Sequence, residues 1–446
     1  MTVSHKKARL VLLLGVLFLL GLAAVMHCTM FQWDDTVADD MDLRVAAVEV
    51  PASQNGILVL MSAPEPWPLY GSPNENKLWT MAAGEDAVDL SLVENVVSRN
   101  AELLTAVDKA VAAADFKVPW PPLESRSENE LQQYTSIVGR AAMTARFRAI
   151  GLAEKGRVMD ALNAAMIAAQ LGRRFQRAGV DMGRWGAGSG AVVAACAVMW
   201  GTVRRSDAPV PELLLYRTRL GQLEPDVAEA SECLKKDYLK SAQIVRQNAS
   251  AGFDAMNEVV PMNDRFDDPV SRWFFGSRYF LKPNATVRCL AEATRCLIGN
   301  LELPGARRAR WGEPGFERYR MHGRFLPNSV GWYIANEFFS AENGLFLLAY
   351  DLQRLVVRAT STLIALKCYY EREKKLPDDL KALVPEFLEE VPRDPFDGES
   401  LRYSAADRIL YSVGTDLQDA GGKPDSGGGR LRYGMPPSEP TFAIDF

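Results

Sequence analysis

The chain has 446 residues, of which 48% are hydrophobic and 24% are charged, and this composition excludes wholesale disorder. Its length is sufficient for a sizeable core and favours two folded units over one. The formal net charge of -5 is small for this length, so the composition gives no reason to expect nucleic acid as a partner.

An uncharged, mostly apolar run at residues 10–31 is the first predicted element. A helix of about 20 apolar residues spans the roughly 30 Å hydrocarbon core of a bilayer. Basic residues stay on the cytoplasmic side of such a helix. We therefore predict a transmembrane signal anchor at 10–31, a cytoplasmic tail at 1–9 and an extracytoplasmic body. A cleaved signal peptide is the alternative, and it places the body on the same side. The flanking charges are Lys6, Lys7 and Arg9 before the run and Asp34, Asp35, Asp39, Asp40 and Asp42 after it.

Residues 32–85 are predicted to be a linker with short local structure, because prolines, glycines and asparagines recur there. Residues 86–340 are predicted to be a helical domain, because apolar residues recur at steps of three and four. An alanine-rich hairpin around residues 155–157 has the rhythm of a tetratricopeptide-like unit, but no second copy follows at a fixed period, and ordinary helix packing is favoured. The long helices are expected at 89–114, 128–154, 157–178, 185–205, 223–250 and 284–300.

A second uncharged run, residues 185–203, is rich in glycine and alanine and has arginines at both ends. Its modest hydrophobicity and lack of charge asymmetry favour a buried helix over a second membrane span. Gly186–Ala191 within it fits the pattern GxGxxA. A dinucleotide site would need a strand before it and an acid about 20 residues after it, whereas here arginine-rich helical sequence precedes it and Arg204 and Arg205 follow.

Candidate catalytic and metal-binding residues are sparse in the body. The six cysteines form no CxxC pair, and with only three histidines they do not form a zinc motif. Cys289 and Cys296 are about 10 Å apart along a helix, so free thiols are expected rather than a disulfide. His322 lies in the basic, aromatic stretch 301–335, which is interpreted as a solvated loop or as a patch for phosphate or anionic head groups. No catalytic residues are assigned.

The pattern changes near residue 341. A helix is expected from Leu345 to about Lys374, then a short helix ending near Glu389, two strands around 401–404 and 409–413, and a last strand at 441–446. The predicted fold class is thus mainly α: an N-terminal membrane helix, a multi-helix body and a small C-terminal α+β module with a short antiparallel sheet.

The C-terminal motifs resemble the C-terminal half of the major pseudopilins of type II secretion, a module also carried by uncharacterised bacterial envelope proteins. The resemblance covers about a fifth of the chain and implies a pseudopilin-like module at 341–446 and a location in a bacterial inner membrane, with the body periplasmic. The prepilin-peptidase site of that family, a glycine before phenylalanine with a glutamate five residues later, is absent around residues 10–31. A subunit that polymerises like a pilin is therefore not expected. The motifs are Leu376-Pro377, Leu383-Val384-Pro385, Asp394-Pro395-Phe396-Asp397-Gly398 and Tyr411-Ser412-Val413-Gly414-Thr415-Asp416.

In the pseudopilin family, the loop that follows the last of these motifs binds calcium through carboxylates and carbonyls. The resemblance therefore implies Asp416, Asp419 and Asp425 as metal ligands, because calcium takes six to eight oxygen atoms. Uncharged residues between these aspartates thin the acidic run, and a solvated glycine-rich loop is the alternative. No other cofactor is expected.

Together these features predict a membrane-anchored extracytoplasmic protein with a non-enzymatic interaction or scaffolding role, linked to secretion or envelope machinery. Its expected partners are the membrane, through the N-terminal helix, and other proteins that the sequence does not identify. The alternative is a hydrolase that acts on an envelope polymer through acids in the helical domain.

Overall fold

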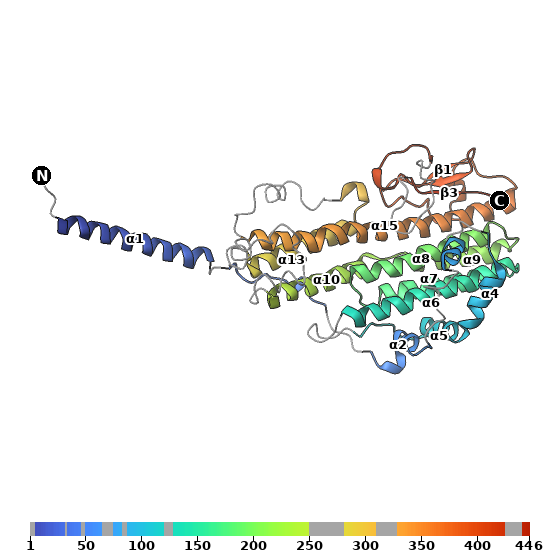
Figure 1. Cartoon of the computed structure of the whole chain (residues 1–446). Coiled ribbons are helices and arrows are strands. Elements are labelled where there is room, and N and C mark those ends of the chain that lie inside the picture. The colour runs from blue at the N-terminus through green and yellow to red at the C-terminus, as the bar shows by residue number, and fades with distance from the viewer. Residues whose placement is uncertain are drawn as a thin grey trace. The chain divides into compact units, whose positions relative to one another are not determined.

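The computed structural model describes residues 5–31, 34–45, 50–64, 75–82, 87–119, 128–248, 281–308, 328–423 and 439–446. The chain is mainly helical, with a small three-stranded antiparallel sheet near the C-terminus, as the sequence predicts (Figure 1). It divides into two compact units. Unit 1 comprises residues 1–44, 237–297 and 309–341, and unit 2 comprises residues 45–236, 298–308 and 342–446.

Three consecutive helices form the centre of unit 2, and they lie side by side in Figure 1. Their short connections make neighbouring helices antiparallel. Gly156 has a φ of +71° in the α6–α7 turn, a conformation that glycine adopts without strain. Helices α7 and α8 approach closely, because a Cβ on Gly188 would lie 2.7 Å from the carbonyl oxygen of Gly172. The predicted hairpin around residues 155–157 is observed as the packed pair α6 and α7. The helices are α6 (Glu128–Glu154), α7 (Val158–Gln176) and α8 (Met182–Val203).

Shorter helices cover α6. The single helix predicted at 89–114 is wrong, because α4 ends at Arg99 and α5 begins at Ala101. The side-chain amide of Asn100 donates to the carbonyl of Val96 at 2.9 Å, which ends α4 at this point. The short helices are α2 (Gly56–Met61), α3 (Glu75–Ala82), α4 (Leu90–Arg99), α5 (Ala101–Ala112) and the single turn η2 (Ala52–Gln54).

The remaining helices differ in how well the sequence predicted them. Helix α9 is not among the sequence predictions, whereas α10 and α13 match the predicted helices closely. Helices α10, α13 and α15 contribute residues to both units. Helix α15 begins at Ser329, not near Leu345 as the apolar pattern predicts. These elements are α1 (His5–Phe31), η1 (Met41–Leu43), α9 (Val210–Leu220), η3 (Gly221–Leu223), α10 (Val227–Asn248), α13 (Pro283–Leu301), η4 (Gly305–Arg307) and α15 (Ser329–Glu373).

The C-terminal module packs a small sheet beside the end of α15 in unit 2. The sheet has the order β1-β2-β3, and Leu410 is opposite both Tyr403 and Phe442. The three predicted strands are confirmed. The short helix predicted to end near Glu389 is instead one 3₁₀ turn, because Pro385 has no N–H with which to continue a helix. The elements are η6 (Leu380–Leu383), β1 (Arg402–Ser404), β2 (Ile409–Tyr411), η7 (Gly414–Asp416) and β3 (Thr441–Ala443).

Candidate functional site

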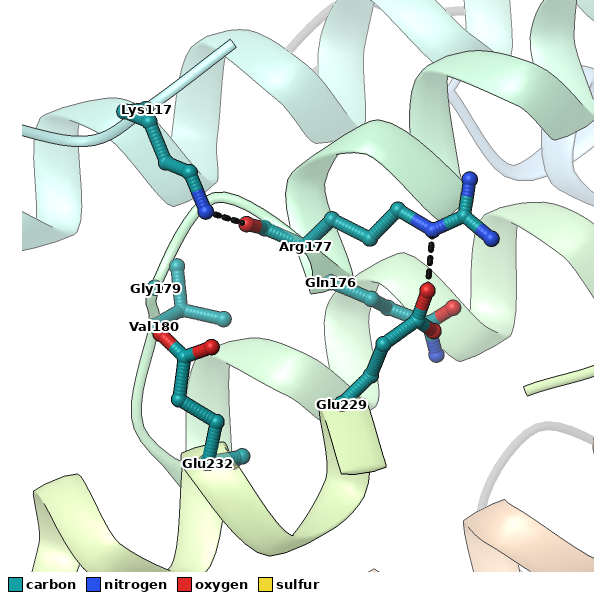
Figure 2. Close-up of a pocket in the computed structure, with 8 residues that line it drawn as sticks. Lys117, Gln176, Arg177, Gly179, Val180, Glu229 and Glu232 are labelled. Atoms are coloured by element: carbon teal, nitrogen blue, oxygen red, sulfur yellow. Dashed lines mark hydrogen bonds and ion pairs between the residues drawn. The ribbon is translucent and has the colours of Figure 1, made fainter. Parts of the chain in front are cut away.

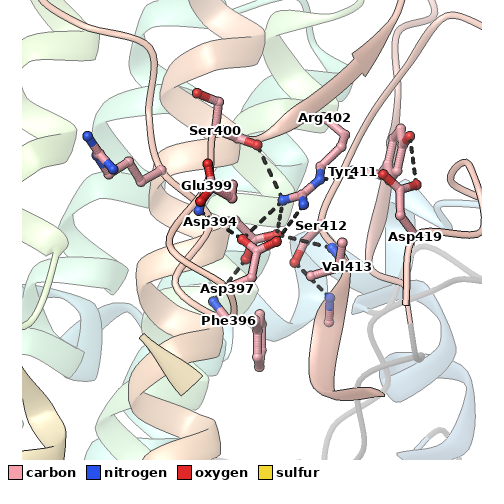
Figure 3. A network of polar contacts seen from close by, with 12 residues as sticks. Asp394, Phe396, Asp397, Glu399, Ser400, Arg402, Tyr411, Ser412, Val413 and Asp419 are labelled. Atoms are coloured by element: carbon pink, nitrogen blue, oxygen red, sulfur yellow. Dashed lines mark hydrogen bonds and ion pairs between the residues drawn. The ribbon is translucent and has the colours of Figure 1, made fainter. Parts of the chain in front are cut away.

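The C-terminal loop contains two of the three implied calcium ligands within the described residues. Asp416 ends η7, and its Oδ1 accepts a hydrogen bond from the N–H of Gln418 at 3.0 Å. Asp419 accepts a hydrogen bond from the Tyr411 hydroxyl at 3.2 Å (Figure 3). Asp425 lies outside the described residues.

The described acids of this loop do not by themselves fit a calcium ion. No group of three or more His, Cys, Asp or Glu side chains that could hold a metal occurs among the described residues. The Nε atom of Arg402 lies 3.7 Å from Oδ2 of Asp419, so a positive charge already faces that carboxylate. A calcium ion beside it would be repelled. The calcium site therefore stays a prediction that depends on Asp425.

Glu439 at the far end of this loop was missed by the sequence reasoning. Its side chain is 2% exposed, and its Oε1 accepts a hydrogen bond from the N–H of Ala420. Its Oε2 is buried and has no hydrogen-bond partner within the described structure. The contact ties the two ends of the loop together. No sequence motif predicts this role of Glu439, because the backbone group that it binds, the N–H of Ala420, lies 19 residues away in the chain.

The motif Asp394–Gly398 forms a polar network with β1 and β2 (Figure 3). The carboxylate of Asp394 accepts hydrogen bonds from the N–H groups of Phe396 and Val413, both at 3.0 Å, and Arg402 binds Asp397. Burial raises the pKa of Asp394, and these hydrogen bonds only partly oppose that rise. Each group has a partner that fixes the turn against the sheet. The motif that carries the resemblance thus has a structural role here.

A buried polar seam joins α7, η3 and α15 in unit 2. The Gln176 amide donates to Gln353 at 2.7 Å, and the Gln353 amide donates to the carbonyl of Leu223 at 2.8 Å. Nearby, Glu224 accepts hydrogen bonds from both Arg354 and Arg358. Glu224 therefore holds both of these arginines of α15 in place.

Two further polar residues of α15, Asp351 and Lys367, are buried in the structure. They are only 2% and 6% exposed. Arg308 donates two hydrogen bonds to Asp351, one of them from Nη2 to Oδ1 at 2.7 Å, and its side chain is 9% exposed. Arg308 is thus a buried ion-pair partner and not part of a solvated loop. Burial raises the pKa of Asp351, and the two bonds from Arg308 oppose the rise. The rest of the basic stretch from 309 to 327, including His322, lies outside the described residues.

A pocket of about 250 Å³ lies between the C-terminal end of α7 and the start of α10 (Figure 2). Lys117 donates to the carbonyl of Arg177 at 2.7 Å, and the Arg177 side chain binds Glu229. Glu229 is also bound by the buried Arg173, at 2.5 Å. The lining residues are Lys117, Gln176, Arg177, Gly179, Val180, Glu229, Glu232 and Cys233.

The two acids of this pocket are paired with basic residues, Glu229 with Arg173 and Arg177, and Glu232 with Lys236. Burial raises the pKa of Glu232, but the hydrogen bond from Lys236 at 2.8 Å and the charges of Lys236, Lys117 and Lys235 together lower the pKa overall. A general acid at neutral pH needs a carboxyl group whose pKa is raised. Glu232 does not meet that condition, and charged residues of both signs line the pocket.

The described cysteines are free thiols, as the sequence predicts. Cys289 and Cys296 form no disulfide. Burial raises the pKa of Cys196, Cys289 and Cys368 to about 12, so these thiols are protonated and unreactive at neutral pH. Residues 186–191 lie inside α8, so the GxGxxA pattern forms a helix interior and not a phosphate-binding turn.

Two helices bear on membrane attachment, and they differ in burial. By length and composition, α8 is the one helix of the described chain that could cross a membrane, and the described side chains of α1 form a shorter apolar stretch, Leu12–Val25. Side chains of α8 such as Trp185 and Met199 are completely buried. In α1 the large apolar side chains are exposed, with Leu12 at 72% and Phe18 at 70%.

A scan of protein-family models finds no match to this chain, and searches of curated proteins and of solved structures find none either.

Proposed function

We propose that this protein is anchored in a bacterial inner membrane by α1 and works outside the cytoplasm in a non-enzymatic interaction or scaffolding role. The observation that carries the proposal is the exposed apolar surface of α1. Water does not favour a helix that exposes leucine and phenylalanine along its length, whereas lipid does. The basic residues before α1 and the aspartates after it set the orientation.

The burial of α8 supports α1 as the anchor. Helix α8 packs Gly188 against α7, and its core side chains are already covered by protein. Moving α8 into lipid would also separate the buried Ser189 from the carbonyl of Ala349, to which its hydroxyl donates at 3.0 Å. If α8 is a core helix and α1 faces lipid, the apolar side chains of both helices are kept out of water.

The C-terminal module supports a link to secretion or envelope machinery through its pseudopilin-like motifs. Its order of elements, a long helix followed by a three-stranded antiparallel sheet, agrees with that proposal. A role in binding rather than catalysis agrees with the paired charges of the pocket beside α7.

Membrane fractionation and topology reporters test the proposal. A reporter active only outside the cytoplasm, fused after Phe446, should give signal, and one active only inside should give none. Leu17→Arg should release the protein from membranes, because a centrally placed arginine costs about 2.5–3.5 kcal/mol on insertion. Leu17→Ile and Ala197→Arg, the latter at an exposed position of α8, should leave it membrane-bound. Retention of Leu17→Arg with loss of Ala197→Arg would assign the span to α8 and refute the proposal.

A further inference from the structure

Residues 34–44, called the strap below, bind to α10 and α13 within unit 1. Asp34 receives hydrogen bonds from the backbone N–H groups of Asn284 at 2.9 Å and Ala285 at 3.4 Å, both in the first turn of α13. A carboxylate at this position satisfies N–H groups that have no partner within the helix, and it interacts favourably with the helix dipole. The first residue of the strap therefore caps α13.

Two arginines of α13 bind the strap further along. Arg295 donates to both carboxylate oxygens of Asp42, from Nε at 2.9 Å and from Nη2 at 2.6 Å. Arg288 donates to the carbonyl of Thr36 at 3.0 Å and forms an ion pair with Asp35 at 3.5 Å. One exposed ion pair is weak, but charged and backbone contacts spaced along one helix fix the position of the segment together.

The middle of the strap is buried against α10. Asp40 is 6% exposed and accepts hydrogen bonds from the Tyr238 hydroxyl at 2.8 Å and from Arg246 at 3.1 Å, and Leu43 is 1% exposed. Burial raises the pKa of Asp40, but the bonds from Tyr238 and Arg246 lower it overall, so the carboxylate is ionised at neutral pH. The strap is thus an ordered part of unit 1, although it falls in the stretch that the sequence describes as a linker.

The chain leaves little distance between the strap and α1. Helix α1 ends at Phe31, and Asp34 follows after three residue steps, which span at most about 11 Å. The headgroup layer on each side of a bilayer is roughly 5–7 Å thick. The first turn of α13, which Asp34 caps, is therefore within reach of the headgroups. The strap itself exposes two apolar side chains, Val37 at 73% and Met41 at 66%.

We infer that the strap holds unit 1 against the lipid headgroup layer of the bilayer that α1 spans, so that the body rests on the membrane instead of moving on a free tether. This inference rests on the proposed anchor. The surface that meets the headgroups comprises the first turn of α13, with Lys282 directly before it in the chain, and the strap, which exposes Val37 and Met41. Cationic and apolar side chains together suit an interface that is charged at the headgroups and apolar below them.

Fluorescence quenching in the reconstituted full-length protein tests the inference. A fluorescent non-natural residue at position 285, in the first turn of α13, is exposed to liposomes whose lipids carry a nitroxide on the headgroup. We expect most of the emission to be quenched. Arg288→Glu/Arg295→Glu places like charges opposite the strap aspartates and should relieve much of that quenching. The matched variant Arg288→Lys/Arg295→Lys keeps the charges and should retain it. Both variants leave the residues that flank α1 unchanged.

Flotation of the same liposomes separates the two proposals. Protein that fails to float with the lipid overturns the anchor, and the quenching result then has no bearing on the strap. Floating protein with weak quenching at position 285 overturns the strap inference and leaves the anchor standing. Floating protein whose quenching is strong but equal in the glutamate and lysine variants also overturns it, because the arginine contacts would then not hold unit 1 in place.

Discussion

The close approach of α7 and α8 predicts that alanine has opposite effects on stability at two glycines of α8, Gly188 and Gly186. A Cβ on Gly188 would lie 2.7 Å from both the Gln176 Cγ and the Gly172 carbonyl oxygen, whereas a Cβ on Gly186 would meet nothing within 4 Å. A backbone carbonyl cannot rotate away, so Gly188→Ala must push the two helices apart. Gly186→Ala changes only the conformational preference of the helix.

The magnitudes follow from these distances. Replacing a helical glycine by alanine gains about 0.8–1 kcal/mol in helix propensity. Overpacking a tight contact costs roughly 1–3 kcal/mol, and a rigid backbone partner favours the upper part of that range. We therefore expect Gly186→Ala to be slightly more stable than the wild type and Gly188→Ala to be less stable, with the two differing by about 2–3 kcal/mol.

Thermal unfolding of the full-length protein in mild detergent measures the difference. For a domain of about 150–250 residues, 1 kcal/mol shifts the Tm by roughly 2–4 °C, so the two variants should be separated by several degrees. Equal Tm values for the two variants would show that α7 and α8 are not packed through Gly172 and Gly188. The same result would remove the structural reason for treating α8 as a core helix.

Four further outcomes are expected. Arg308→Met should destabilise unit 2 by about 3–5 kcal/mol in denaturant unfolding, since it leaves the charge of Asp351 buried without a partner, and adding Asp351→Leu should recover most of the loss. Asp40 has a lowered pKa in the folded state, so its contribution to stability is present above its unfolded pKa of about 3.9 and is lost as the pH falls through the folded value; Asp40→Asn should flatten the acid limb of a stability–pH curve. The thiol of Cys196, whose pKa burial raises to about 12, should resist iodoacetamide at pH 8 until denaturant is added, and labelling of folded protein at this residue would contradict the burial. Millimolar calcium or EDTA should leave the Tm unchanged; a rise with calcium that Asp416→Ala removes would establish the site that the resemblance implies.

The local pattern of the sequence was sufficient for most of the long helices and for the strands, but it missed α9 and the true start of α15. Apolar residues at steps of three and four placed α6, α7, α10 and α13 close to their observed ends, and short alternating runs gave the three strands. It failed where one polar residue overrides a periodic pattern. Asn100 ends α4 by bonding its own helix, and no hydrophobic period reports that.

The sites depended on contacts between residues far apart in the chain. Arg308 and Asp351 are 43 residues apart, and each alone looks like a solvent-facing charge on a polar face. Glu439 likewise looked unremarkable until its carboxylate was placed on the backbone of the loop. The partners that neutralise these charges are chosen by tertiary packing, so a one-dimensional pattern cannot identify them.

By itself the sequence determined the class of each segment, because helix and strand periods, charge flanks and turn residues act over a few neighbours. It therefore set out a mainly helical chain, a small C-terminal sheet and an apolar N-terminal helix with opposite charges at its ends. The sequence also favoured 185–203 as the buried apolar helix, and only the tertiary structure decided which residues cover it and which acids are bound. Residues 34–44 show why: their aspartates read as a solvated linker, yet the side chains of α10 and α13 that bind them lie about 200 and 250 residues further along the chain. Burial and charge pairing belong to the folded arrangement, and the free energy that orders such a segment comes from contacts that exist only there.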